Sequence, residues 1–352
     1  WPPRCAPTRT RRTGSTRLQL PERTFVMAGE PDTRPAAPER VIVVGAGVGG
    51  LCLAQGLRRA GVGVAVYEPG VAAGFGINRR TLREILLADL TDVVHPGHVL
   101  TRYEQRPGGL VRAHFAGGAV VDGELLVGAD GTNSAVRRQL LPDAGVDHLR
   151  SVLYGRTPLT DATPGWLPDV LLDTFNKVTA PDGGFLMVGT CRTRDPVGPA
   201  VARLAPRVRL TPVPDYLSWT LQAPHAPVDA GPDELHRHAE ELVRDWHADG
   251  RRLVAEAEVP ATTRIELGSA RPVPPWDTPN VTLLGDAAHT MSPALGEGAN
   301  TALRDAAALV AALAGSTDPA RFARAKVGYE TELLRYGAEM VAASLTGFGP
   351  PR

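Results

Sequence analysis

The stretch VIVVGAGVGGLCLAQGLRRAGVGVAVYE, residues 41–68, decides the fold of this chain. Its first four residues are apolar and β-branched, which is typical of a short strand buried on both faces. After the glycines, apolar residues recur at helical spacing until Gly61, and a second apolar run then ends at Glu68. The order of strand, glycine turn, helix and strand predicts a βαβ unit.

The glycines of this stretch have the spacing Gly45-x-Gly47-x-x-Gly50. Gly45 permits a tight turn, Gly47 lets a pyrophosphate approach the backbone, and Gly50 lets the helix pack against the strand. The first helical turn offers free N–H groups to phosphate, and Glu68 stands where a carboxylate accepts ribose hydroxyls. A glycine-rich solvent loop is the alternative, but it does not explain why all these features agree. The stretch therefore predicts a dinucleotide site.

The composition describes an ordinary globular protein. With 352 residues, 43% of them hydrophobic, the chain is long enough for one large or two modest domains. Lysine plus arginine equals aspartate plus glutamate at 38 each, so no charge excess predicts binding to nucleic acid or to an anionic membrane. The three cysteines are scattered, which favours a reducing cytoplasm over a disulfide framework. No metal-ligand spacing is visible, and the longest apolar run, residues 306–314, is too short for a bilayer.

The first 39 residues are expected to form a disordered tail and linker. They begin with an arginine- and proline-rich stretch that has no apolar core for a signal peptide. A Pro/Ala-rich linker follows Met27, which suggests this methionine as the start of native translation.

Two further strand-and-turn combinations carry acids. Residues 125–127 predict a buried strand, followed by the turn Gly128-Ala129-Asp130-Gly131 and a helix. Residues 281–284 predict another buried strand that ends at Gly285-Asp286 and leads through a glycine-rich segment into a long Ala/Leu helix. A carboxylate at a strand end, next to a glycine-rich helix start, is typical of a polar-ligand site.

The remaining elements are predicted more coarsely. Helices are expected at 82–90, 232–246 and 318–345, and strands at 99–103, 110–115, 184–190 and 216–222. Three arginines lie near the start of the first of these helices, namely Arg79, Arg80 and Arg83. They could bind a phosphate or simply form a solvated helix face, and the sequence favours neither interpretation.

Side chains of the two later strands could line an aromatic pocket, namely Phe185, Met187, Tyr216 and Trp219. Ordinary core positions are the commoner use of such residues. His236 and His238, beside Glu234 and Glu240, are interpreted as a solvated helix face.

Three motifs in order, GAGVGG with Glu68, GADGTNSAVR at 128–137 and LLGDAAHTMSPALGEGAN at 283–300, resemble the flavin-binding motifs of the class A flavoprotein monooxygenases, the family that includes para-hydroxybenzoate hydroxylase. The resemblance covers residues 40–344 and weakens between 156 and 260. It implies an α/β fold with a Rossmann-like FAD-binding domain, an inserted mostly β substrate domain and C-terminal helices. The implied limits are 40–150 and 271–352 for the FAD-binding parts and 151–270 for the substrate domain.

The resemblance also implies site residues. The first glycines and Glu68 would hold the ADP half of FAD, Asp130 and Gly131 belong to a motif shared between FAD and NAD(P)H, and Asp286 would bind the ribityl or pyrophosphate part. Pro293 would lie at the reacting edge. His289 is a candidate acid or base, with a packed turn residue as the preferred alternative. The implied cofactor-binding residues are Gly45, Gly47, Gly49, Gly50, Glu68, Arg79, Asp130, Gly131, Gly285, Asp286, Pro293, Gly296, Gly298 and Asn300.

The implied activity is an NAD(P)H- and O2-dependent FAD monooxygenase that hydroxylates an aromatic or polycyclic small molecule through a C4a-hydroperoxyflavin, in natural-product biosynthesis. The expected location is the cytoplasm, with no metal, nucleic acid or membrane partner and with the oligomeric state left open. A flavin-dependent reductase or oxidase without oxygen insertion is one alternative, and a non-catalytic FAD-binding protein is another. A halogenase is disfavoured because its Trp-x-Trp-x-Ile-Pro stretch is missing from the sequence.

Two features depart from the family pattern. The interval between the first βαβ unit and the helix near Arg79 is considerably longer in relatives, whereas here Gly76 runs almost directly into Asn78. Pro69 also replaces the usual arginine after the ribose-binding acid. Both departures bear on catalysis more than on cofactor binding, and they motivate the non-catalytic alternative.

Overall fold

The structure is a computed structural model that describes residues 39–69, 78–172, 175–180, 183–193, 197–204, 206–314 and 319–346. The predicted tail before residue 39 and the short interval at Gly76 lie outside these ranges. Within them, no helix combines the length and the apolar character needed to cross a membrane.

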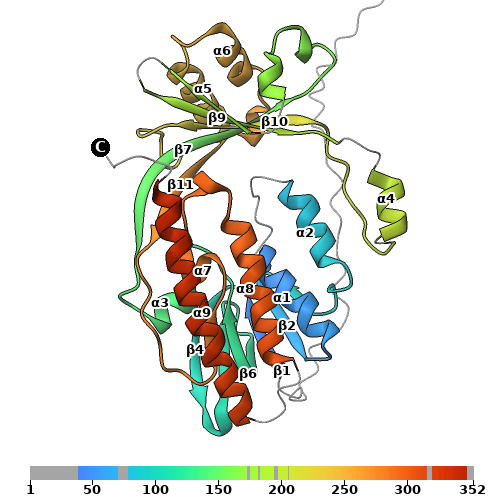
Figure 1. Cartoon of the computed structure of the whole chain (residues 1–352), viewed down its shortest axis with the longest axis vertical. Coiled ribbons are helices and arrows are strands. Elements are labelled where there is room, and N and C mark those ends of the chain that lie inside the picture. Colours follow the sequence, from blue (N-terminus) through green and yellow to red (C-terminus); the bar gives the residue numbers. More distant parts are fainter. Residues whose placement is uncertain are drawn as a thin grey trace, which may run out of the picture. The chain divides into compact units, whose positions relative to one another are not determined.

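The first sheet has seven strands in the order β3-β2-β1-β6-β5-β4, with β12 also paired to β6 (Figure 1). β1, β2, β3, β6 and β12 run parallel, whereas β5 pairs antiparallel with both β4 and β6, which gives the two predicted hairpins. The apolar runs become central strands because both faces of this sheet are covered. The strands are β1 (Glu39–Val44), β2 (Val64–Glu68), β3 (Val94–Pro96), β4 (Leu100–Arg106), β5 (Leu110–Phe115), β6 (Val120–Gly128) and β12 (Val281–Leu283).

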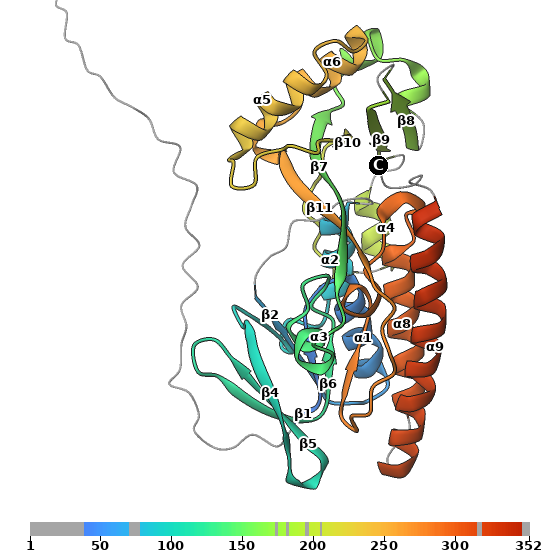
Figure 2. The ribbon, with the colours of Figure 1, turned by 90° about the vertical axis from the view of Figure 1, so that its left-hand side faces the viewer.

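Three helices stack in layers on one side of this sheet. α1 packs between the sheet and α8, and α9 runs along the outer side of α8 (Figures 1 and 2). Leu51 and Leu57 of α1 are completely buried, as their helical spacing predicts. The helices of this part are α1 (Val48–Arg59), α2 (Arg79–Leu87), α3 (Ala135–Leu140), α7 (Asp286–His289), α8 (Gly298–Leu313) and α9 (Pro319–Thr346), with short 3₁₀ turns η1 (Pro107–Gly109) and η5 (Pro293–Leu295).

The second sheet is antiparallel, with five strands in the order β11-β7-β10-β9-β8. One of its faces packs on α5 and α6 around a separate hydrophobic core that includes Leu153, Leu217 and Leu221. Its elements are β7 (Val146–Pro158), η2 (Thr163–Gly165), η3 (Asp169–Leu172), β8 (Phe175–Thr179), β9 (Phe185–Cys191), α4 (Val197–Leu204), β10 (Tyr216–Gln222), α5 (Pro232–Leu242), α6 (Ala248–Ala255), η4 (Val259–Ala261) and β11 (Thr263–Ala270). The predicted fold class, α/β with a second mostly β sheet and C-terminal helices, is confirmed. The residue limits of the domains stay a prediction.

The predicted helix at 232–246 is wrong in its extent. α5 ends at Leu242, because the backbone tightens there and Trp246 N donates to Val243 O at 3.0 Å. A second helix, α6, then starts after His247. Apolar spacing continued across this turn because Val243 and Trp246 still face the same core.

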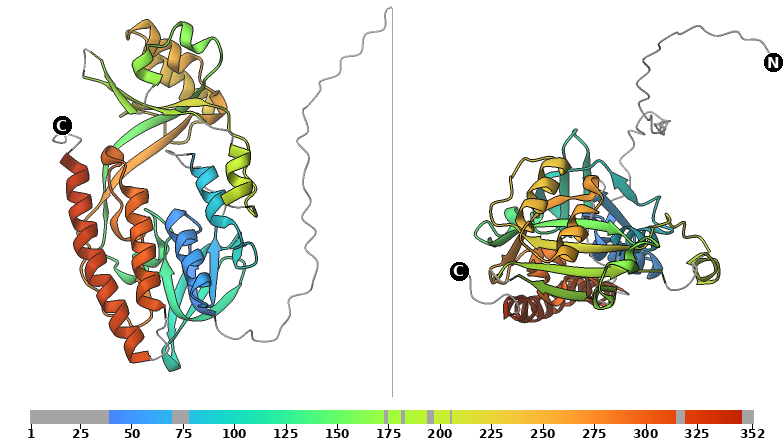
Figure 3. Two further views of the ribbon diagram at one scale, coloured as in Figure 1. Left: turned by 45° about the vertical axis from the view of Figure 1, so that its right-hand side comes forward. Right: turned by 90° about the horizontal axis from the view of Figure 1, so that it is seen from above.

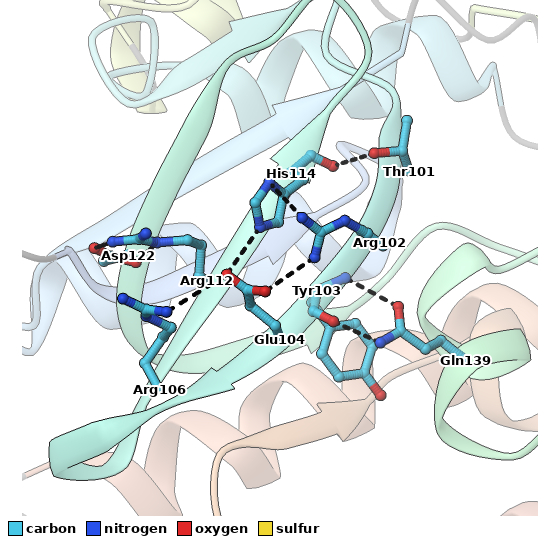
Figure 4. Close-up of polar contacts among 9 residues, drawn as sticks. All are labelled: Thr101, Arg102, Tyr103, Glu104, Arg106, Arg112, His114, Asp122 and Gln139. Atoms are coloured by element: carbon cyan, nitrogen blue, oxygen red, sulfur yellow. Dashed lines mark hydrogen bonds and ion pairs between the residues drawn. The ribbon is translucent and has the colours of Figure 1, made fainter.

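The outer hairpins are held by side-chain contacts that the sequence does not reveal (Figure 4). Gln139 of α3 accepts from Tyr103 N at 2.9 Å and donates to Tyr103 O at 2.6 Å, so its amide pairs with β4 as another strand would. Arg112 and Asp122 form a two-pronged ion pair between β5 and β6, with both N···O distances at 2.7 Å. These contacts fix the hairpins beside the parallel strands.

Candidate cofactor site

The turn between β1 and α1 leaves room for a phosphate. Gly45 has a φ of +107°, and a side chain there would overlap the backbone of Ala129, so only glycine fits. At Gly47 an added Cβ would meet nothing within 4 Å. α1 begins directly after Gly47 without a side-chain cap, so its first N–H groups face this open space. The predicted fit between turn, helix end and pyrophosphate agrees with this geometry.

The next two glycines of the motif serve packing. A Cβ on Gly49 would overlap the side chain of Leu284, and one on Gly50 would overlap Gly45 O. Because neither glycine has a side chain, α1 can lie close to the strand ends. The cofactor contact predicted for Gly49 stays a prediction.

Glu68, at the end of β2, points its carboxylate at the same turn. Its Oε2 accepts from Ala46 N at 2.5 Å. No other described residue hydrogen-bonds to this carboxylate, so Oε1 is left for a hydroxyl donor. A carboxylate fixed by one backbone bond and open at its other oxygen suits a ribose.

Replacing Gly47 by alanine tests the open space above α1. Because the φ of Gly47 is −72° and no protein atom is near, the free energy of unfolding should change by no more than about 0.5 kcal/mol. The dissociation constant for FAD, measured by flavin fluorescence, should rise about threefold to tenfold as backbone contacts are lost. Gly328→Ala, also in open space, is the matched control. Equal FAD affinity in both variants would place the pyrophosphate elsewhere.

The second acid, Asp130, is used mainly within the protein. Its Oδ2 accepts from Ala135 N at 2.7 Å and from Val136 N at 3.4 Å, so it caps the start of α3. Its Oδ1 is buried without a hydrogen-bond partner among the described residues. Gly131 follows with a φ of +75°. One orphaned oxygen therefore remains available to a ligand.

The third turn places Asp286 at the first position of α7. Gly285 has a φ of +61°, and its N donates to Asp305 Oδ2 at 3.0 Å. Burial raises the pKa of Asp286 above its ordinary value, although the positive charges of His289 and Arg79 oppose the rise. No described residue donates a hydrogen bond to the Asp286 carboxylate. The charge of Arg79 thus acts on Asp286, whose carboxylate is left as an acceptor for ligand hydroxyls. The cofactor roles of both residues stay predictions.

Arg137 holds the second and third turns together. Its buried guanidinium donates to Thr132 O at 2.5 Å and to Ala287 O at 2.9 Å. Burial lowers the pKa of Arg137, while the charge of Asp130 opposes this. This residue lies inside the second motif, but no spacing in the sequence indicates that it reaches the third.

His289 lies in a buried ion pair. Its Nε2 is 2.6 Å from Asp305 Oδ2 of α8, and its ring packs against Gly337 of α9, where a Cβ would lie 2.9 Å from His289 Cδ2. Burial alone would lower the pKa of His289, but the hydrogen bond and charge of Asp305, with the charge of Asp286, outweigh it and raise the pKa. This placement favours the packed turn residue over the acid or base.

Residues 290–292 after His289 are buried, and exposure begins at Pro293. Pro293 begins η5 and is exposed, and Gly296 follows with a φ of +69° and no atom within 4 Å of an added Cβ. Gly298 starts α8, which has no side-chain cap. Asn300 donates to Glu297 at 3.2 Å. The uncapped N-terminus of a long helix suits a group with negative charge.

Of the four side chains that could line an aromatic pocket, Trp219 takes the alternative, an ordinary core position. Cross-strand register pairs Met187 with Thr220 and Trp219 with Val188, so Tyr216 and Met187 share one face of the antiparallel sheet while Trp219 points to the other. Trp219 is completely buried in the core against α5 and α6 and donates to Thr157 Oγ1 at 3.2 Å. Alternation along one strand shows two faces, but it does not show which face the core takes.

Tyr216, on the face turned away from that core, approaches the start of α2. Its phenol hydrogen-bonds with the side chains of Cys191 and Asn78, and burial raises its pKa above the ordinary value. Asn78 directly precedes Arg79. The aromatic face of the sheet therefore reaches the start of α2, the helix that begins with Arg79. No group of three or more metal-ligating side chains occurs in the described ranges.

Comparison with known proteins shows that this chain is similar to proteins that bind FAD. A family model described as FAD binding domain matches residues 100–344. A dual O-methyltransferase/FAD-dependent monooxygenase of Phaeosphaeria nodorum is 31% identical over 74% of this chain, and a 3-amino-4-hydroxybenzoate 2-monooxygenase of Streptomyces cremeus is 32% identical over 67%. The chain spans 31% of the length of the first and 53% of the second. The crystal structure of a Photorhabdus luminescens protein assigned as an FAD-containing monooxygenase superposes with a TM-score of 0.72 at 28% identity, covering 88% of this chain and 97% of that one.

Proposed function

Because the chain belongs to the FAD-binding-domain family, the class A flavoprotein monooxygenases that include para-hydroxybenzoate hydroxylase, we propose that it hydroxylates an aromatic or polycyclic small molecule with NAD(P)H and O2. The Streptomyces cremeus relative is named for an aromatic acid substrate, which supports an aromatic compound here. A place in natural-product biosynthesis is part of the same proposal.

One observation carries the proposal. The dinucleotide turn at Gly47 and Glu68 and the acid Asp286 follow the carboxyl ends of parallel strands in one sheet. The charge of Arg79 acts on Asp286, and the side chain of Tyr216 reaches Asn78 beside Arg79. A binding protein for a nucleotide alone needs only the dinucleotide turn. An enzyme that brings a flavin to an aromatic compound needs the acid and the aromatic side chain as well.

FAD bound at this site would supply hydride acceptance and oxygen activation. The residues of this chain would do the rest. The α1 N-terminus binds the pyrophosphate, Glu68 accepts from the ribose, and Asp286 accepts from ribityl hydroxyls. The α8 N-terminus favours negative charge on the nearby ligand edge. The five-stranded sheet, backed by its own core, excludes bulk water from one side of the substrate.

The test is to supply the purified protein with FAD, NAD(P)H, labelled O2 and a panel of phenols and aromatic acids. We expect NAD(P)H oxidation stimulated by at least one compound, with labelled oxygen in its product. If all reducing equivalents end as hydrogen peroxide with every compound, the protein is a reductase or oxidase. If FAD binds but NAD(P)H is not oxidised, it is a non-catalytic FAD-binding protein.

A further inference from the structure

The helix α2 carries Arg79 at its first position but contributes little to the core. None of its nine residues is fully buried. Its C-terminal end is fixed to α1, where Gln55 Nε2 donates to Leu86 O at 2.9 Å and also to Ala88 O. The N-terminal half, which includes Arg79, depends on other contacts to keep its place.

Glu84 joins the middle of α2 to the loop 206–215. Its carboxylate accepts two hydrogen bonds from Thr211, at 2.8 Å from the backbone N and 2.7 Å from Oγ1, and lies 3.2 Å from Arg80 Nε. The Glu84 side chain is only 20% exposed, so these bonds are partly shielded from water. Burial would raise the pKa of Glu84, but the hydrogen bonds from Thr211 and the charge of Arg80 outweigh it and lower the pKa.

The same loop continues into β10, whose first residue contacts the start of α2. Asn78 caps α2, since its Oδ1 accepts from Thr81 N at 3.0 Å. The Asn78 side chain also hydrogen-bonds with the Tyr216 phenol. The segment from α4 to β10 therefore holds α2 at two points. The helix α4 itself lies at the outer edge of the molecule in the right-hand view of Figure 3. An exposed pair, Arg207 with Asp89 at 3.4 Å, adds little.

We propose that Glu84 and Thr211 are positioning residues that keep Arg79 in place at the start of α2, where its charge acts on Asp286. A helix fixed at its C-terminal end to α1 and at its middle to this loop has little freedom to tilt. Its first residue then keeps its position relative to the acid that is proposed to bind the cofactor. The inference rests on the proposed placement of FAD beside Arg79, but it does not depend on oxygen transfer.

The test uses the full chain and FAD binding without turnover. Thr211→Val removes the Oγ1 donor with little change of shape, and it should raise the dissociation constant for FAD about threefold to tenfold. Amide hydrogen exchange should become faster in residues 79–87 and stay unchanged in α8. Thr211→Ser keeps the donor and should restore both values. Thr331→Val on α9, which removes an exposed hydroxyl bonded to Val327 O at 2.9 Å, is the matched control.

A double-mutant cycle shows whether the tether acts through the arginine. In an Arg79→Ala background, Thr211→Val should add little or no further loss of FAD affinity. Equal affinity of Thr211→Val and wild type, or full additivity with Arg79→Ala, would overturn the positioning role. Either result would leave the monooxygenase proposal standing. If FAD affinity depends on Thr211 but no oxygen is incorporated into any product, the positioning role stands and the monooxygenase proposal fails.

Discussion

Replacing Glu68 by alanine is expected to raise the dissociation constant for FAD about tenfold or more. A hydrogen bond between a carboxylate and a ligand hydroxyl is worth about 1.5–3 kcal/mol, and Glu68 Oε1 is the oxygen that accepts no hydrogen bond from any described residue. Its other oxygen, at 2.5 Å from Ala46 N, fixes the carboxylate toward the glycine turn. Titration of apoprotein with FAD, followed by fluorescence, measures the change.

Two further variants separate ligand binding from damage to the turn. Glu68→Gln keeps an acceptor for Ala46 N but removes the charge, so its loss of affinity should lie between those of wild type and Glu68→Ala. Glu332→Ala breaks an exposed ion pair on α9, at 2.8 Å from Arg335, and should not alter FAD binding. Equal FAD content in Glu68→Ala and wild type after dilution would refute the ribose role of Glu68.

The dinucleotide turn could be predicted because its determinants are local. Apolar runs, glycine spacing and a terminal acid all lie within residues 41–68, and the φ of +107° at Gly45 agrees with the role assigned to that glycine. The two hairpins could be predicted for the same reason, since their turns and alternation are contiguous. The strand–turn–acid segments at Asp130 and Asp286 also formed as predicted.

Contacts between distant segments could not be predicted. The tie of Arg137 to Ala287 O spans 150 positions, and the bond of Glu84 to Thr211 spans 127. Both depend on how separate elements pack, which apolar periodicity does not encode. β7 and β11 were not predicted either, because β7 mixes charged and apolar residues and its pairing partners, β10 and β11, come much later in the chain.

Asp305 is the clearest example of such a residue. It stands in the middle of the Ala/Leu-rich helix α8 and belongs to no motif. Its Oδ2 nevertheless accepts from Gly285 N at 3.0 Å and lies 2.6 Å from His289 Nε2. Asp305 is 4% exposed and His289 4% exposed, so the pair is buried. One carboxylate therefore holds both the turn that presents Asp286 and the imidazole behind it.

Replacing Asp305 by asparagine is expected to lower the free energy of unfolding by about 3–5 kcal/mol near pH 6, because a buried imidazolium loses its partner. The pKa of His289 is raised in the folded protein above its ordinary value near 6.5. The folded state therefore binds the proton more tightly, and this stabilisation is complete below about pH 6.5 and is lost as the pH rises through the raised pKa. The difference between wild type and Asp305→Asn should shrink over the same range.

Urea unfolding of both proteins, at a series of pH values from about 5.5 upward, measures this difference. The surface pair of His247 and Asp249, at 3.2 Å with the His247 side chain 82% exposed, provides the matched control. Asp249→Asn should cost no more than about 1 kcal/mol, because exposed pairs contribute little. A loss in Asp305→Asn that stays constant with pH would show that the bond to Gly285 N, and not the charge of His289, is what Asp305 contributes. In that case His289 would be neutral in the folded protein, and its assignment as a charged partner of Asp305 would fail.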